Sequence, residues 1–252
     1  MLALAAFCLG GFWATLHFGF WAALPSLGSI SLAERLGWEA ALAIQLGALA
    51  AIWLALKRWA HGARQRPLWD GPLDWRRLAR GPWSLLLGAI SLALLNWAIL
   101  VIAGHPWSIT WAFTLWGAKA AMALGWDPAA SAFWTGGFPE NALGRGILDD
   151  TTSVMDIGIM LGAFAAAGLA GRFAPVWRIP WRSAAAALIG GLLMGYGARL
   201  AYGCNIGAFF SGIASTSLHG WLWIVCALMG VWIGVRLRPL FGLEVERPTG
   251  SA

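Results

Sequence analysis

Long apolar runs constrain this chain more than any other feature of its sequence. Each run is close to the ~20 residues that an α-helix needs to cross the hydrocarbon core of a bilayer. Charged residues make up only 11% of the 252 residues, against 60% hydrophobic residues, and a soluble domain of this length needs far more polar surface. The sequence therefore predicts an all-α integral membrane protein, a polytopic helical bundle. The runs fall near residues 2–24, 38–56, 83–103, 153–171, 183–201 and 220–236.

Basic residues gather in two of the connections between these runs. Clusters of this kind mark cytoplasmic loops, so we expect residues 57–82 and 172–182 on the cytoplasmic side. Both termini then also lie in the cytoplasm, and residues 127–150 form an irregular loop on the outer side. The net charge of +6 follows from this arrangement and does not indicate nucleic-acid binding. The basic residues concerned are Lys57, Arg58, Arg64, Arg66, Arg76, Arg77, Arg80, Arg172, Arg178 and Arg182.

Three ionisable residues interrupt the apolar stretches, where a charge usually faces a polar interior. Lys119 is explained equally well by a side chain that reaches the membrane interface. Asp156 lies near the start of its run, where the dipole of a helix N-terminus stabilises a carboxylate. Arg199 comes directly before a break in the apolar pattern. It is the strongest candidate for a charge that faces a substrate, although its place near the helix end also allows it to reach the interface.

The break lies within GYGARLAYGCNIGAFFSG, residues 195–212. Gly203 can end a helix in a conformation closed to other residues, and Asn205 is suited to cap the short helix that follows. Two short apolar stretches, 108–126 and 205–218, do not fit a full span, and we expect the second to be a re-entrant half-helix. Broken helices place substrates within membranes, and helix N-termini favour anions. The predicted anion-binding residues are Cys204, Arg199, Asn205, Gly203 and Gly207.

The three cysteines of the chain are widely spaced. Without a CxxC pair they predict neither a disulfide framework nor a metal site. Cys8 and Cys226 are interpreted as small apolar residues within helices, whereas Cys204 places its thiol at the break. A membrane thiol enzyme would need a base beside the thiol, and His219 is better explained as an interfacial or capping residue. We therefore expect a protein that is not an enzyme and uses no metal and no cofactor.

One long segment resembles a known family. GYGARLAYGCNIGAFFSGIASTSLHGWLW, followed by GVWIGVRLRPLFGLE, is similar to the C-terminal signature of the YeeE/YedE sulfur-transport family. The stretches GHPWSITWAFTLWGAKAAMALGWD and GILDDTTSVMDIGIMLGAFAAA also resemble that family, so the resemblance covers about residues 100–243. It implies two inverted pseudo-repeats with re-entrant half-helices, and thiosulfate that passes from thiol to thiol. Cys204 matches the second-half cysteine of that relay.

The resemblance also sets the expected organisation and partners. No counterpart of the family's first-half Gly-Cys loops is found, so the chain resembles a member that lacks the N-terminal part of that half, a remnant of the inverted-repeat fold. We expect one membrane domain over residues 1–252, with N-terminal helices in 1–104, the family-like repeat in 105–243 and a tail in 244–252. The expected location is the bacterial cytoplasmic membrane.

Two functions of different classes are consistent with these features. The first is membrane transport of thiosulfate or a related small sulfur-containing anion through a cavity lined by the Cys-bearing helix break. The expected partners are that anion, the lipid bilayer, and a cytosolic sulfur-carrier protein or a companion membrane chain, with no nucleic acid. The alternative is a non-transporting accessory or structural subunit of a larger membrane complex.

Overall fold

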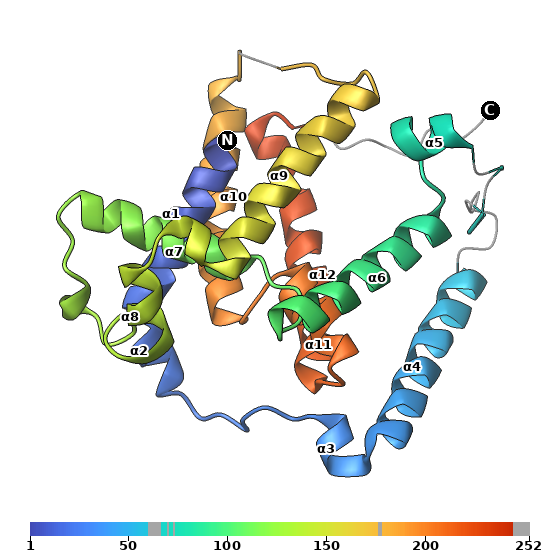
Figure 1. Cartoon of the computed structure of the whole chain (residues 1–252), viewed down its shortest axis with the longest axis horizontal. Helices are drawn as coiled ribbons and strands as arrows, with labels where there is room; N and C mark the ends of the chain where they lie inside the picture. The colour runs from blue at the N-terminus through green and yellow to red at the C-terminus, as the bar shows by residue number, and fades with distance from the viewer. Residues whose placement is uncertain (60–66, 70, 73, 176–177, 244–252) are drawn as a thin grey trace.

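The structure is a computed structural model that describes residues 1–59, 67–69, 71–72, 74–175 and 178–243 (Figure 1). These residues form helices and turns. The α-helices are α1 Leu2–Leu16, α2 Phe18–Ala22, α3 Leu32–Leu36, α4 Trp38–Trp59, α5 Trp75–Arg80, α6 Leu85–Ala103, α7 Thr110–Ala123, α8 Gly137–Gly144, α9 Thr151–Leu169, α10 Trp181–Leu200, α11 Ser211–Ala214 and α12 Leu218–Leu237. The shorter helices are η1 Pro128–Ala130, η2 Ile147–Asp149, η3 Asn205–Phe210 (a π-helix) and η4 Arg238–Phe241.

Five helical segments of the described chain are long and apolar enough to cross a membrane. They correspond to five of the six expected spans and confirm an all-α polytopic membrane protein. The remaining run differs from the prediction, because α1 has only 15 residues and ends at Leu16, before the short helix α2. The five segments are Trp38–Trp59, Leu85–Ala103, Thr151–Leu169, Trp181–Ala214 and Leu218–Phe241.

Helix α1 packs in parallel against α10 with the face that carries its small residues. Gly191 lies against Ala3 and Ala6, and Gly195 lies against Phe7 and Gly11, so residue numbers rise together along the two helices. Gly191 and Gly195 are spaced as in the GxxxG motif, in which small residues let the backbones of membrane helices approach closely. The missing Cβ atoms of these two glycines therefore make the contact possible.

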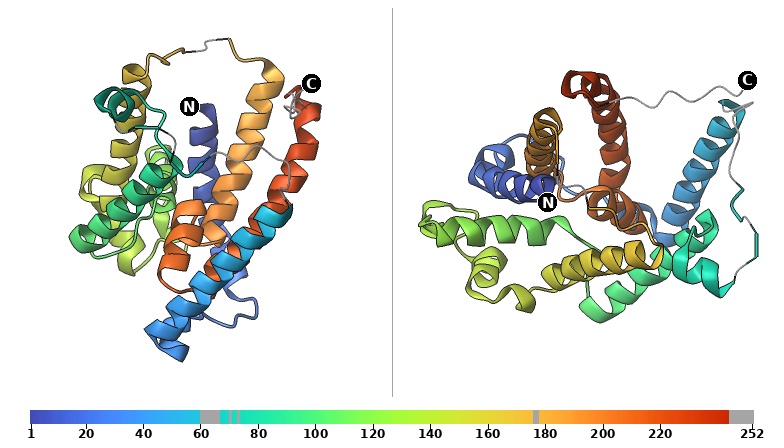
Figure 2. Two further views of the ribbon diagram at one scale, coloured as in Figure 1. Left: turned by 90° about the vertical axis from the view of Figure 1, so that its right-hand side faces the viewer. Right: turned by 90° about the horizontal axis from the view of Figure 1, so that it is seen from above.

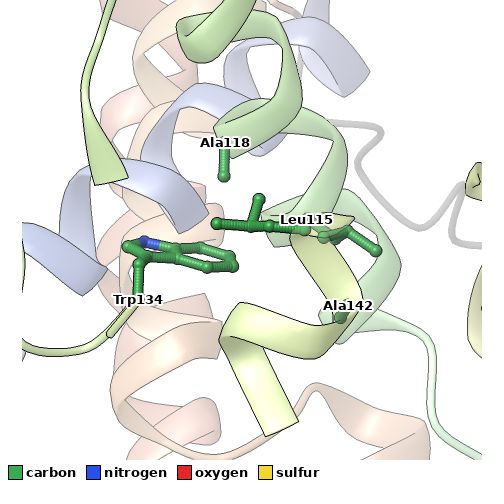
Figure 3. Packing of buried hydrophobic residues seen from close by; sticks show 5 residues of the cluster. Leu115, Ala118, Trp134 and Ala142 are labelled. Carbon is green, nitrogen blue, oxygen red and sulfur yellow. The ribbon is translucent and has the colours of Figure 1, made fainter. Parts of the chain in front are cut away.

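The predicted irregular loop at 127–150 is in fact a folded segment that carries the core. It contains η1, α8 and η2, and α8 begins at Gly137 with Pro139 in its first turn, where a missing N–H costs no helical bond. Trp134 is almost fully buried, at 1% exposure. Its indole Nε1 donates to Thr15 Oγ1 of α1 at 2.8 Å. The buried cluster around it consists of Leu115, Ala118, Trp134, Ala142 and Leu143 (Figure 3).

A short main-chain bridge ties the segment before α3 to the turn after α11. The amide of Leu32 donates to the carbonyl of Thr216 at 2.9 Å, and the amide of Leu218 donates to the carbonyl of Ile30 at 3.0 Å. Ser31 and Ser217 form the isolated antiparallel bridge between these bonds. Helix α4 follows α3 and stands away from the other helices (Figures 1 and 2), so this bridge joins the start of the α3–α4 arm to the bundle.

Helix α5 and the start of α10, which both carry basic residues, lie at one end of the bundle. In Figure 1 this is the upper end, where α5, the end of α9, the start of α10 and the N-terminus are found. Helix α5 contacts α9, and η4 contacts α10. Segment 127–150, α2 and α11 lie toward the opposite end.

Candidate functional site

The predicted break after α10 is present, but it is built differently from the expectation. The amide of Gly203 donates to the carbonyl of Ala198 at 2.9 Å, and the amide of Tyr202 donates to that of Arg199 at 3.4 Å. These are the two bonds of a Schellman turn. The left-handed residue of the turn is Tyr202, with φ of 53°, and not Gly203. A tyrosine in this conformation is strained and persists only where its surroundings hold it.

Gly203 is required for a different reason. Its φ is +155°, and a Cβ at this position would lie 2.5 Å from the amide nitrogen of Ala208. The chain turns back so tightly that the start of η3 packs on the glycine itself. At Gly207 the nearest atoms to an added Cβ are Ser108 Oγ and the Tyr202 carbonyl oxygen, both at 3.9 Å. A methyl group has room there.

Cys204 is the last residue of the break and caps η3 through its backbone. Its carbonyl oxygen accepts hydrogen bonds from the amides of Ala208, at 2.8 Å, and Phe209, at 3.3 Å. The expected capping by Asn205 is wrong, because Asn205 is the first residue of η3 and no side chain caps this helix. The π-helical start uses the carbonyl of Cys204 instead. The Cys204 side chain is half-buried and Asn205 is exposed.

Arg199, in the last turn of α10, is surrounded by aromatic rings. Its guanidinium carbon lies 5.3 to 6.0 Å from four ring centroids, within cation–π range. The side-chain Nε is buried and has no hydrogen-bond partner among the described residues. A buried N–H of a charged group without an acceptor is costly. The rings belong to Phe18, Trp111, Phe133 and Tyr202.

A hydrogen bond to the start of α9 holds the Trp111 ring in place. Its Nε1 donates to Asp150 Oδ1 at 3.1 Å. Asp150 Oδ2 accepts from the amide of Ser153 at 2.8 Å and from its hydroxyl at 2.7 Å. The Ser153 hydroxyl in turn accepts from Trp116 Nε1 at 2.9 Å. Two tryptophans of α7 are thus hydrogen-bonded to the first turn of α9, which fixes one wall beside Arg199.

The two other ionisable residues have surroundings that the sequence did not indicate. The Lys119 Nζ donates to the carbonyls of Leu143 at 2.8 Å and Arg145 at 2.6 Å. It thereby satisfies carbonyls at the end of α8, where a cation is favoured. Asp156 lies six residues after Asp150, the N-cap of α9, and is buried at 1% exposure.

Sequence reasoning missed the ring walls around Arg199. Phe18 lies in α2, Trp111 in α7 and Phe133 in the segment before α8, so no spacing in the sequence connects them. Only Tyr202 could have been predicted as a neighbour of Arg199, because it follows three residues later in the stretch around the break. Cys8 lies within helix α1, and its carbonyl packs against Gly117 of α7.

A cavity of about 210 Å³ lies apart from the break, beside α8 and the start of α9. Arg145 and His105 line it, but so do Asp149 and Asp150. The negative charges of Asp149 and Asp150 repel an anion, so we do not assign the anion site to this cavity. Among the described residues there is no group of three or more metal-ligating side chains. Arg199 supplies a cationic side chain in the last turn of α10, and Cys204 supplies a thiol at the N-cap of η3.

Comparisons with known proteins agree on one family. The sequence matches the family described as Sulphur transport over residues 1–233, a wider range than the segment that first showed the resemblance. The chain is 35% identical over 175 residues to "Probable transporter YedE" of Escherichia coli (strain K12), which covers 68% of this chain and 42% of that protein. It is 44% identical over 78 residues to "Thiosulfate transporter TsuA" of Spirochaeta thermophila, covering 30% of this chain and 23% of that protein. No solved structure gives a significant match.

The fold and the break define a multi-pass helical membrane protein with a ring-enclosed arginine, Arg199, and a cysteine, Cys204, at an interrupted helix. The chain belongs to the Sulphur transport family, whose match covers residues 1–233. Its alignment with the Escherichia coli relative YedE spans 42% of that protein's length. The activity of the longer relatives is therefore a proposal for this chain.

Proposed function

We propose that this protein transports thiosulfate or a related small sulfur-containing anion across the bacterial cytoplasmic membrane. The observation that carries the proposal is the Arg199 guanidinium, which is enclosed by aromatic rings, has a buried Nε without an acceptor and directly precedes the Cys204 break. The family match and the relatives called thiosulfate transporters support the same substrate class. Transport, and not catalysis, is the function that these groups suit.

The chemistry of the two side chains complements a sulfur oxyanion. The planar fork of a guanidinium binds two oxygen atoms of an oxyanion at once. The surrounding rings keep water away, and an ionic contact is stronger where the local dielectric is low. The thiol of Cys204 then meets the terminal sulfur of thiosulfate through a weak S–H···S contact. Gly203, Asn205 and Gly207 shape the backbone next to this thiol.

The proposed orientation places both termini and the basic segments in the cytoplasm. The described basic residues of α5, of the start of α10 and of η4 lie at one end of the bundle, and the positive-inside rule assigns such an end to the cytoplasm. Segment 127–150 then faces the outer side. A cytosolic sulfur carrier is the proposed acceptor of the imported sulfur.

The test is uptake of labelled thiosulfate by cells that lack their own importer. Cys204→Ser nearly preserves volume, so it should reach the membrane at the wild-type level while uptake falls strongly, because a hydroxyl is less polarisable than a thiol. Cys226→Ser is the matched control, since this exposed residue of α12 lies away from the break and should leave uptake unchanged. Equal uptake by wild type and Cys204→Ser contradicts the role of Cys204.

The accessory-subunit alternative rests on one structural observation. In the spanning windows of α4 and α6, only 11% and 0% of the residues are buried, so these helices present their surfaces to lipid or to another chain. Purification from the native membrane distinguishes the two. A stoichiometric complex together with absent thiosulfate uptake favours the accessory subunit, and uptake by the purified protein in liposomes favours transport.

A further inference from the structure

A carboxyl group without a partner lies in the interior of the bundle. Asp156 is 1% exposed, and neither of its side-chain oxygens has a hydrogen-bond partner among the described residues. It belongs to α9, one of the membrane-spanning helices. An isolated ionised carboxylate in such a place costs far more than a neutral one, so the group exists there as the acid. Residues of this kind in membranes commonly carry protons.

The groups that face Asp156 do not neutralise it. Cys8 of α1 and Asp150 at the start of α9 lie near it, and neither supplies a positive charge. Lys119 of α7 is engaged by two carbonyls at the end of α8. Helix α5 contacts α9 at its far end (Figure 1). The charged groups on the elements packed against α9 are Lys119, Asp149, Asp150, Arg76, Arg77 and Arg80.

The site suits a proton and not a metal cation. Metal cations such as Ca²⁺ or Mg²⁺ need about six oxygen ligands, and among the described residues there is no cluster of three or more metal-ligating side chains. A proton needs a single oxygen. We propose that Asp156 binds a proton that crosses the membrane together with the transported anion. The step is a simple protonation: a carboxylate oxygen takes up H⁺ on one side and releases it on the other.

A chain of contacts connects this site to the break. Asp156 follows Ser153 by three residues on α9, so the two share a helix face. Ser153 and Asp150 hold the Trp111 ring that forms one wall beside Arg199. A change of charge at Asp156 alters the packing of the first turns of α9 against α7, and the Trp111–Asp150 bond carries that change to the arginine. The inference rests on the proposed function, because the proton is coupled to that anion.

The experiment uses the purified full-length protein in liposomes, with a trapped pH dye and labelled thiosulfate. One coupled proton raises the equilibrium accumulation ratio about tenfold for each pH unit of an acid-outside gradient, because one pH unit equals a tenfold ratio in proton activity. We expect this response, with acidification of the interior, for wild type. Asp156→Asn should still carry thiosulfate but lose both the response and the acidification. Asp149→Asn removes a nearby exposed carboxylate and should behave as wild type.

Infrared difference spectra provide a measurement that does not depend on transport. At neutral pH the wild type should show the carbonyl stretch of a protonated carboxyl group that Asp156→Asn lacks. If wild type carries no thiosulfate, the proposed function fails, and the infrared band alone decides the proton site. An absent band overturns the proposal, and so does an unchanged gradient response in Asp156→Asn.

Discussion

Gly195 of α10 faces the carbonyl oxygen of Phe7 in α1 so closely that a Cβ at this position would overlap it. We predict that Gly195→Ala lowers the stability of the protein by about 1–3 kcal/mol, the range for overpacked interiors. Gly197→Ala, two residues away with nothing within 4 Å, should be neutral or slightly stabilising, because alanine favours helix over glycine. Thermal unfolding in detergent, followed by circular dichroism, measures both. Equal transitions for the two variants would show that the parallel α1–α10 contact is absent.

The two glycines at the break should respond differently to the same change. Gly203→Ala places a methyl group 2.5 Å from the Ala208 amide nitrogen at a φ of +155°, so we expect a lower level in the membrane. Gly207→Ala meets nothing closer than 3.9 Å and should reach the membrane normally. Immunoblots of membrane fractions test this directly. A normal level of Gly203→Ala would mean that segment 201–207 is not folded as described.

Binding of the anion should depend on the charge and shape of the residue at 199. Arg199→Gln removes a charged hydrogen bond worth about 1.5–3 kcal/mol, so affinity for thiosulfate should fall roughly ten- to a hundredfold. Arg199→Lys keeps the charge without the planar fork and should restore part of the affinity. Calorimetry on the purified protein measures the three, with the exposed Arg182→Gln as control. Equal affinity in all variants would leave Arg199 without a role in binding.

The buried bond between Trp134 Nε1 and Thr15 Oγ1, at 2.8 Å, should contribute about 1 kcal/mol of stability. Trp134→Phe and Thr15→Val each remove it, and a double-mutant cycle separates the bond from the lost packing. We expect a coupling energy close to the value of one hydrogen bond. A coupling energy of zero in unfolding experiments would show that the segment before α8 does not dock on α1.

Labelling of introduced cysteines tests the orientation. Trp75→Cys, at an exposed position of α5, should react with an impermeant reagent from the cytoplasmic side alone. Asn141→Cys, an exposed position of α8, should react from the outside alone. The increase over the signal of the native cysteines is the measured quantity. The reverse pattern would invert the proposed topology.

The helix interruption at 201–204 could be predicted from the sequence, because glycine, asparagine and cysteine in an apolar run are a local signal. The detailed role of each residue could not. Tyr202 took the left-handed position and Cys204 the capping position because the first turn of η3 folds back on Gly203, a close approach that depends on residues further along the chain.

The position of α1 was beyond local reasoning. Its composition is that of a membrane span, and only the folded chain shows that it is short and packs on α7 and α10. Gly191 and Gly195 have the GxxxG spacing, which predicts close packing of a helix but does not indicate which helix packs there. The same holds for Arg199 and Trp134, whose neighbours come from distant segments that meet only in the folded chain.

The bridge at Ser31 and Ser217 attaches the segment that leads into α3 and α4 to the rest of the bundle. Hydrogen bonds of the main chain join this segment to the turn that ends the short helix after Cys204. These bonds belong to the backbone, so they do not depend on which side chains the two segments carry. The start of the α3–α4 arm and the turn that follows the cysteine-bearing segment are therefore one connected unit of main chain.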